Sequence, residues 1–113
     1  MQLKDYAEKI RHLCLYPEAR QGTVAALCYT GLGLAGEAGE VANQIKKILR
    51  DDGGQVTPQR REKLLSELGD VAWYFVRLCE ELQLDLDHVL EENVKKLYDR
   101  RDRGSLVGDG DTR

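Results

Sequence analysis

Two pairs of acidic residues are spaced so that each pair falls on one face of a helix. Glu37 and Glu40 are three residues apart, and so are Glu67 and Asp70. Carboxylates at this spacing are neighbours on a helix and repel each other. A divalent cation between them reverses that repulsion, and Mg²⁺ prefers oxygen ligands and keeps several waters when it binds a phosphate-bearing substrate. The four carboxylates are therefore candidate ligands of a divalent metal.

The spacing of these pairs leaves two interpretations open. The chain has 20 acidic residues among 113, so pairs three residues apart also arise on an ordinary solvated helix face. The composition around them favours a site, because glycine and alanine flank the acids in GEAGE (36–40) and ELGD (67–70). Small neighbours leave room for a bulky ligand. Two facing helices that each offer such a pair would form a metal site inside a helical bundle, where such sites are commonly built.

The elements that must position these carboxylates are predicted to be four helices. Apolar residues recur every three or four positions in the stretches 3–13, 24–49, 58–82 and 86–97, which is the helical period. Thr57-Pro58 predicts a helix start, and Asp85 is a candidate N-cap for the last helix. No stretch alternates as a strand does. We therefore expect an all-α fold, a small four-helix bundle that is oligomeric.

Four glycines interrupt the first half of the second predicted helix. They are Gly31, Gly33, Gly36 and Gly39. Each interior glycine costs about 1 kcal/mol of helix propensity relative to alanine. The glycines therefore indicate either a break in the helix or a surface that a neighbour approaches closely. We favour a helix whose early part is irregular or tightly packed against a neighbour.

Length and charge limit the classes of protein to which the chain can belong. With 113 residues it suits one domain, which we place at 1–103, followed by a Gly- and Asp-rich tail at 104–113 that is either disordered or folds over a substrate as a lid. The formal net charge of −3 argues against a nucleic-acid partner, which needs a positive surface. It leaves room for a small phosphorylated ligand held by metal and a few local cations.

The cysteines and the apolar runs predict a cytoplasmic protein. Cys14, Cys28 and Cys79 are widely spaced and odd in number, so we expect three reduced, buried thiols. The start of the chain has no apolar segment of the kind that targets secretion, and no apolar run approaches the ~20 residues that span a bilayer. We expect no membrane partner.

Three stretches of the chain resemble the MazG-like nucleotide pyrophosphohydrolases of the all-α NTP pyrophosphatase superfamily. The stretches are GLAGEAGEVANQIKK (33–47), SELGDVAWYFVRL (66–78) and NVKKLYDRRDRGSLVGDGDTR (93–113). The family pattern is ExxE on one helix, ExxD on the next, and then N-x-x-K-L-x-x-R. The chain supplies these motifs in order as Glu37, Glu40, Glu67, Asp70, Asn93, Lys96, Leu97 and Arg100. Together they are a specific match that covers most of the chain.

The resemblance implies Mg²⁺-dependent hydrolysis of a nucleoside triphosphate between its α- and β-phosphates, with Mn²⁺ as an alternative metal. The products would be the monophosphate and pyrophosphate. It also implies a homodimer or homotetramer that shares its sites between subunits. The implied metal ligands are Glu37, Glu40, Glu67 and Asp70. The implied phosphate or sugar contacts are Asn93, Lys96 and Arg100, with Lys46 or Lys47 as a further cation.

One position departs from the family pattern. Many relatives read EExxE, and the first Glu is a candidate for orienting the attacking water, but Gly36 stands there in this chain. The general base is therefore open. Either Glu37 or Glu40 takes the proton, or the metal alone lowers the pKa of the water enough. We take Glu37 and Glu40 as the candidate catalytic residues.

Two further questions stay open from the residues alone. Trp73 and Tyr74 follow the second acidic pair, and these rings, like Tyr6 and Tyr29, either pack in the core or stack on a nucleobase. The base and sugar of the substrate are also open, and a narrower nucleotidase acting on dUTP, dCTP or a phosphoribosyl nucleotide is one alternative. Another is a non-catalytic dimerisation or regulatory module that retains the metal site, which the departure at Gly36 favours.

Overall fold

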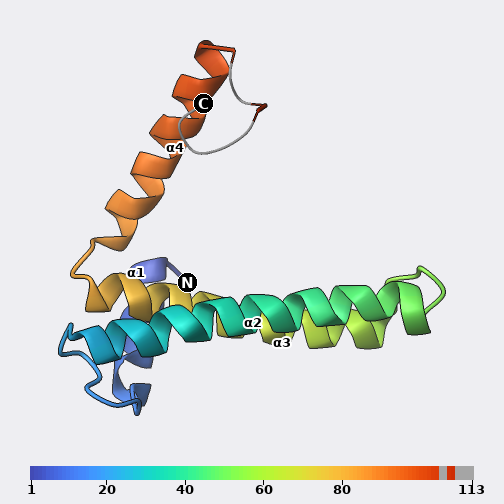
Figure 1. Ribbon diagram of the computed structural model, residues 1–113, viewed down its shortest axis with the longest axis horizontal. Coiled ribbons are helices and arrows are strands. Elements are labelled where there is room, and N and C mark those ends of the chain that lie inside the picture. The colour runs from blue at the N-terminus through green and yellow to red at the C-terminus, as the bar shows by residue number, and fades with distance from the viewer. Residues whose placement is uncertain (105–106, 109–113) are drawn as a thin grey trace.

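The computed structural model describes residues 1–104 and 107–108 (Figure 1). These residues form four α-helices and one short 3₁₀ helix, and no strand is present among them. The elements are α1 (Leu3–Ile10), η1 (Arg11–Leu13), α2 (Val24–Asp51), α3 (Pro58–Glu81) and α4 (Leu86–Asp102). The predicted all-α class is confirmed, and each predicted helix is present within a few residues of its expected ends. The prediction of a lid or disordered tail falls mainly on residues 105–106 and 109–113, outside the described part.

The centre of the fold is a long antiparallel hairpin made by α2 and α3, which lie side by side along their length (Figure 1). Thr23 and Thr57 begin the two helices, and each threonine hydroxyl accepts a hydrogen bond from a backbone N–H of the first turn. The connection turns through Gly53 and Gly54, whose φ angles of +63° and +79° suit glycine. Arg60 closes this end of the hairpin with an ion pair to Asp52 at 2.8 Å.

The hydrophobic core lies at the other end of the hairpin, where α1 and the first turn of α4 meet α3. Its buried members are Ala7, Ile10, Val76, Cys79 and Leu86. The half-buried rings of Tyr6, Trp73 and Phe75 pack against this cluster. Because the core is small and confined to one end, it fixes the start of α4 and does not extend along the rest of that helix.

A single chain does not close the expected four-helix bundle. Helix α4 points away from the α2–α3 hairpin (Figure 1), and the radius of gyration is 17.0 Å, whereas a compact chain of this length has about 13 Å. The apolar stripe of α4 is exposed, as are several apolar side chains of the hairpin. The main members of this exposed set are Leu32, Ile45, Leu49, Leu65, Leu68, Leu90, Val94 and Leu97. The periodicity predicted the stripes correctly, but within residues 1–104 and 107–108 these apolar side chains remain exposed.

The interior glycines do not break α2, which runs unbroken from Val24 to Asp51. Only Gly33 shows the close approach that we expected, because a Cβ at this position would overlap the ring of Tyr74. A Cβ at Gly31, Gly36 or Gly39 would meet no atom within 4 Å. The glycines therefore mark one tight helix contact and otherwise open space.

The expectation of three buried thiols is wrong for two of the cysteines. Cys79 is buried in the core, but Cys14 is half-buried and Cys28 is exposed. Cys28 is exposed on α2, whereas Ala26, two residues earlier, is buried, so apolar neighbours in the sequence do not place the thiol in the core. All three are free of disulfides. None of the helices in the described residues is long and apolar enough to cross a bilayer.

Candidate metal and nucleotide site

Glu37 of α2 meets the acidic pair of α3 across the hairpin. Glu37 lies near the middle of α2, and Glu67 and Asp70 lie near the middle of α3. One carboxylate oxygen from each of these three residues falls within 4.8 Å of the others. Since the two helices run antiparallel, residues distant in sequence are opposite each other at this level. Three of the four predicted ligands are therefore brought together by the fold.

The electrostatics of this group are those of crowded like charges. Burial raises the pKa of Glu37 above its ordinary value, and the negative charges of Asp70, Glu67 and Glu40 raise it further. Repulsion of this kind opposes the charged form of each acid. A bound cation would remove the repulsion, since it interacts favourably with all the carboxylates at once.

The surroundings of the acids fit a hard divalent cation and its ligands. The donors are carboxylate oxygens, which suit Mg²⁺ or Mn²⁺ and not a thiolate-preferring metal. Glu37 and Glu67 are half-buried and Asp70 is exposed, so the group opens to the surface. Gly36, Gly39 and Gly69 flank it, with no atom within 4 Å of where a Cβ would stand. This agrees with the expectation that small neighbours leave room for a ligand.

Glu40 is the predicted ligand that lies outside the group of three. It is exposed on α2, one helical turn beyond Glu37. Its charge nevertheless contributes to the raised pKa of Glu37, so it lies within electrostatic reach of the cluster. Its placement suits either a more distant ligand or a group that exchanges protons with water, and its role stays a prediction.

The predicted phosphate contacts on α4 are not near the acids of the same chain. Asn93 and Lys96 are exposed and line a shallow surface hollow together with His88, Val89 and Glu92. Arg100 is buried near the end of α4. Because α4 points away from the hairpin (Figure 1), one chain alone does not bring these side chains to the acidic cluster. Their roles remain predictions that need a second copy of α4.

Lys46 and Lys47 lie on α2 on the side of Glu37 that is towards the hairpin turn. Lys46 is exposed and donates a hydrogen bond to the Asn43 side chain at 3.2 Å. Lys47 is half-buried, ten residues from Glu37, which is about 15 Å along the helix axis. Of the two, Lys47 is the better placed to face a ligand lying along the hairpin.

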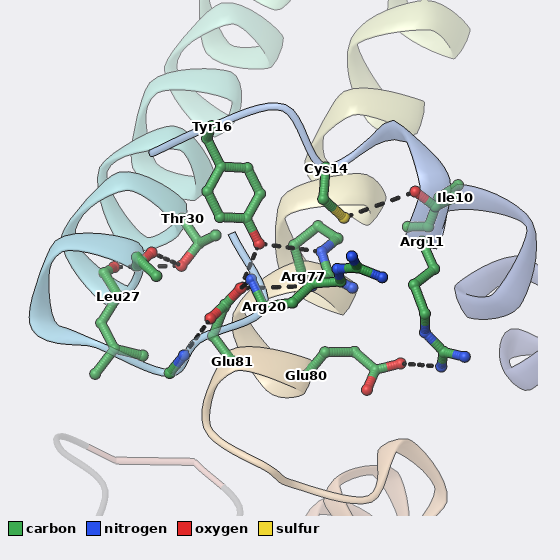
Figure 2. Close-up of polar contacts among 12 residues, drawn as sticks. Ile10, Arg11, Cys14, Tyr16, Arg20, Leu27, Thr30, Arg77, Glu80 and Glu81 are labelled. Carbon is green, nitrogen blue, oxygen red and sulfur yellow. Dashed lines mark hydrogen bonds and ion pairs between the residues drawn. The ribbon is translucent and has the colours of Figure 1, made fainter. Parts of the chain in front are cut away.

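A buried polar network that the sequence analysis missed joins the segment before α2 to the end of α3. The Tyr16 hydroxyl donates to Glu81 Oε1 at 2.6 Å and accepts from Arg77 Nε at 3.2 Å (Figure 2). The backbone N–H of Gly22 donates to Glu81 Oε2 at 2.9 Å. Arg77 and Glu81 are 1% and 4% exposed. The sequence feature that could have indicated this network was the pair Arg77 and Glu81, opposite charges four residues apart within the apolar stripe of α3.

The aromatic residues divide between the core and the hairpin seam. Trp73 packs against the core, which confirms the packing interpretation for this ring. Tyr74 instead lies over Gly33 of α2. Burial, a hydrogen bond with Tyr29, and the charges of Glu37 and Asp70 all raise the pKa of Tyr74. Tyr74 is thus a neutral hydroxyl beside the acidic cluster at physiological pH.

Comparison with known proteins identifies the class to which this fold and site belong. The model of the MazG nucleotide pyrophosphohydrolase domain matches residues 29–104, so the chain belongs to this family. It is also similar to the Gene 37 protein of Mycobacterium phage L5, with 46% identity over 100 residues that cover 88% of each chain. No solved structure matches the chain significantly.

Proposed function

We propose that the protein is a Mg²⁺-dependent nucleoside triphosphate pyrophosphohydrolase that cleaves the bond between the α- and β-phosphates of NTPs or dNTPs. The observation that carries the proposal is the convergence of Glu37, Glu67 and Asp70 within 4.8 Å across the hairpin, in a chain that belongs to the MazG family. Acids held this close without a cation repel each other and do not stabilise the fold. Their proximity has a function if they hold a metal that binds a phosphate chain.

The chain's own residues have distinct tasks in this reaction. Glu37, Glu67 and Asp70 hold the cation, which when bound neutralises phosphate charge and lowers the pKa of water. Water attacks the α-phosphorus, a new P–O bond forms, and the bond to the α,β-bridging oxygen breaks, so that pyrophosphate leaves. Glu40, exposed beside Glu37, accepts the proton from water. This assignment supplies the base that the departure at Gly36 leaves open.

We further propose that the active form is a homodimer or homotetramer. The exposed apolar stripe of α4 needs a partner, and so do the exposed leucines of the hairpin. In such an assembly α4 of one chain would lie against the hairpin of another and bring Asn93, Lys96 and Arg100 to the phosphates. Cationic side chains there would stabilise the charge that develops on the leaving pyrophosphate. The site would then be shared between chains.

A hydrolysis assay in ¹⁸O-labelled water tests the cleavage position. Purified protein receives a panel of NTPs and dNTPs with Mg²⁺ or Mn²⁺, and the products are followed by ³¹P NMR and mass spectrometry. We expect pyrophosphate and a monophosphate that carries one ¹⁸O, and no turnover with excess EDTA. Release of orthophosphate, or label in pyrophosphate alone, contradicts attack at the α-phosphorus.

A test variant and a matched control are compared in that assay. Glu40→Gln should abolish turnover while the helical circular dichroism spectrum stays nearly unchanged, and Glu62→Gln, which changes an exposed acid near the start of α3, should keep activity. If the unmodified protein turns over no nucleotide in either metal, the enzyme proposal is wrong. A non-catalytic regulatory module, which the glycine at position 36 favours, would then be the better description.

A further inference from the structure

An exposed tyrosine ring lies on a rigid support two helical turns from the acidic cluster. Tyr29 is 43% exposed on α2. One face of its ring is stacked on Tyr16, with ring centroids 5.0 Å apart and planes 13° from parallel. Tyr74 approaches it at a tilt of 42°, with centroids 6.2 Å apart. A flat aromatic surface that is backed on one side and open to solvent can accept another flat ring.

The ring that supports Tyr29 is itself fixed in place. Tyr16 is buried, and its hydroxyl is held between Glu81 and Arg77 at 2.6 Å and 3.2 Å (Figure 2). The edge of Trp73 meets the Tyr16 ring at 86°, with centroids 6.1 Å apart. Because the support is ordered before any ligand arrives, stacking on Tyr29 would cost little conformational entropy.

The position of Tyr29 relative to the acids matches the layout of a nucleotide. Tyr29, Gly33 and Glu37 follow each other at four-residue spacing, so they form one row on α2. Eight residues of helix separate Tyr29 from Glu37 by about 12 Å along the axis. Tyr74 fills the space over Gly33 in between. The row therefore runs from an aromatic face, past a neutral hydroxyl, to a group that would hold a metal and phosphate.

We infer that Tyr29 is the surface on which the base of a nucleotide stacks when its phosphates lie at Glu37, Glu67 and Asp70. This inference rests on the proposed function and adds the orientation of the substrate along the hairpin. The sugar lies beside Tyr74, whose ring covers Gly33, and the outer phosphates point towards Lys47. Since every base offers a π-face, a stacking surface binds purines and pyrimidines alike. Tyr29 thus contributes affinity for the nucleoside and little choice among bases.

A binding experiment separates this role from a structural one. Isothermal titration calorimetry in Mg²⁺ measures the dissociation constant of an α,β-imido nucleoside triphosphate, which is not hydrolysed at that bond, and of tripolyphosphate, which has no base. We expect Tyr29→Leu to weaken binding of the imido nucleotide about 5- to 100-fold and to leave tripolyphosphate binding within about twofold of the unmodified protein. Tyr29→Phe and Tyr29→Trp keep the ring and should retain nucleotide affinity.

Each other outcome identifies what has failed. Equal weakening of both ligands by Tyr29→Leu, or a change in its oligomeric state by light scattering, would show that the ring supports the fold or an interface, and would overturn the inference. An unchanged nucleotide affinity would overturn it as well. If the unmodified protein binds the nucleotide more tightly than tripolyphosphate but hydrolyses none, the proposed function fails while stacking on Tyr29 stands. If it binds neither ligand, both proposals fail.

Discussion

Tyr74 of α3 lies so close to Gly33 of α2 that no side chain fits between them. The contact brings the two helices together one turn from Glu37, at the level where the acids of α2 meet those of α3. Glycine at position 33 therefore sets the spacing of the candidate metal ligands, although it has no side chain with which to bind anything. Preserving this spacing is the physical reason for a residue that weakens the helix locally.

Replacing Gly33 tests the importance of this contact. Gly33→Ala should lower the free energy of unfolding by about 1–3 kcal/mol, because the new methyl group overlaps the Tyr74 ring. The matched control is Gly31→Ala, which has open space at its Cβ and should raise stability by about 0.5–1 kcal/mol through helix propensity. Urea unfolding followed by circular dichroism measures both. Equal stabilisation by the two variants would contradict the close approach.

The sequence predicted the helices well because their signals are local. Thr57-Pro58 and Gly53-Gly54 mark a helix start and a turn by backbone chemistry alone, and the structure places both there. The facing acids were also predictable, since Glu37 and Asp70 fall at matching levels of two long helices joined by a short turn. The helices are predictable because their period depends on residues three to four positions apart, and the short turn then fixes which residues of the two helices face each other.

The direction of α4 was not predictable in the same way. An apolar stripe containing Leu90 and Val94 shows that a helix needs a partner, but not which chain provides it. The buried pair of Arg77 and Glu81 was equally inaccessible, because charges four residues apart are usually on a solvated face. What buries them is Tyr16 and the backbone of Gly22, more than 50 residues away.

Removing the charge of Glu81 should destabilise the protein strongly. Its carboxylate accepts hydrogen bonds from Tyr16 and Gly22 and lies 3.5 Å from the guanidinium of Arg77. Glu81→Gln leaves Arg77 as an unpaired buried charge, at a cost of roughly 3–5 kcal/mol. The double variant Arg77→Met with Glu81→Gln should recover part of the loss. Thermal unfolding of the unmodified protein, the single variants Glu81→Gln and Arg77→Met, and the double variant measures the coupling, and additive losses would argue against a buried pair.

The same residue predicts how stability depends on pH. Burial by itself would raise the pKa of Glu81, but hydrogen bonds from Tyr16, Gly22 and Arg20 and the charge of Arg77 outweigh it and hold this pKa below its ordinary value. The unfolded chain therefore takes up the proton first as the pH falls. The stabilisation is fully present above the unfolded pKa of about 4.3 and is lost as the pH falls through the lower folded pKa.

Urea unfolding of the unmodified protein and of Glu81→Gln measures this dependence. We expect the difference in their free energies of unfolding to be constant above about pH 6 and to shrink steadily below about pH 4. Glu92→Gln is a suitable control, because Glu92 is exposed and its pKa is lowered by a surface hydrogen bond from Lys95. A difference that grows on acidification would contradict the sign derived from the Glu81 contacts.

Mg²⁺ should stabilise the folded protein by relieving the repulsion among Glu37, Glu67 and Asp70. At a concentration 100 times its dissociation constant, a ligand that binds only the folded state adds about 2.7 kcal/mol. Thermal unfolding with Mg²⁺, with EDTA, and with NaCl at matched ionic strength measures this effect. The double variant Glu37→Gln with Glu67→Gln should be insensitive to Mg²⁺. The same shift in that variant would place the ion elsewhere.

Mixing two inactive variants tests whether the site is shared between chains. Glu67→Gln alters the hairpin and Lys96→Met alters α4, and each homo-oligomer should be inactive. A mixed dimer contains one site with an intact hairpin from one chain and an intact α4 from the other, so an equal mixture should recover up to about a quarter of normal activity. If each site is built within one chain, the mixture stays inactive. Native mass spectrometry, with one variant labelled with ¹⁵N, confirms that mixed oligomers form.

The hydrogen bond between Tyr16 and Glu81 spans 65 residues of sequence, and this separation bears on the order of folding. The hairpin of α2 and α3 can form through a short turn, whereas the segment before α2 can settle only after the end of α3 exists. Contacts of such long range close a large loop and usually form late. Loss of the Glu81 carboxylate should then speed unfolding and leave the refolding rate nearly unchanged. The aromatic support beneath Tyr29 is, on this view, the last part of the molecule to assemble and the first to come apart.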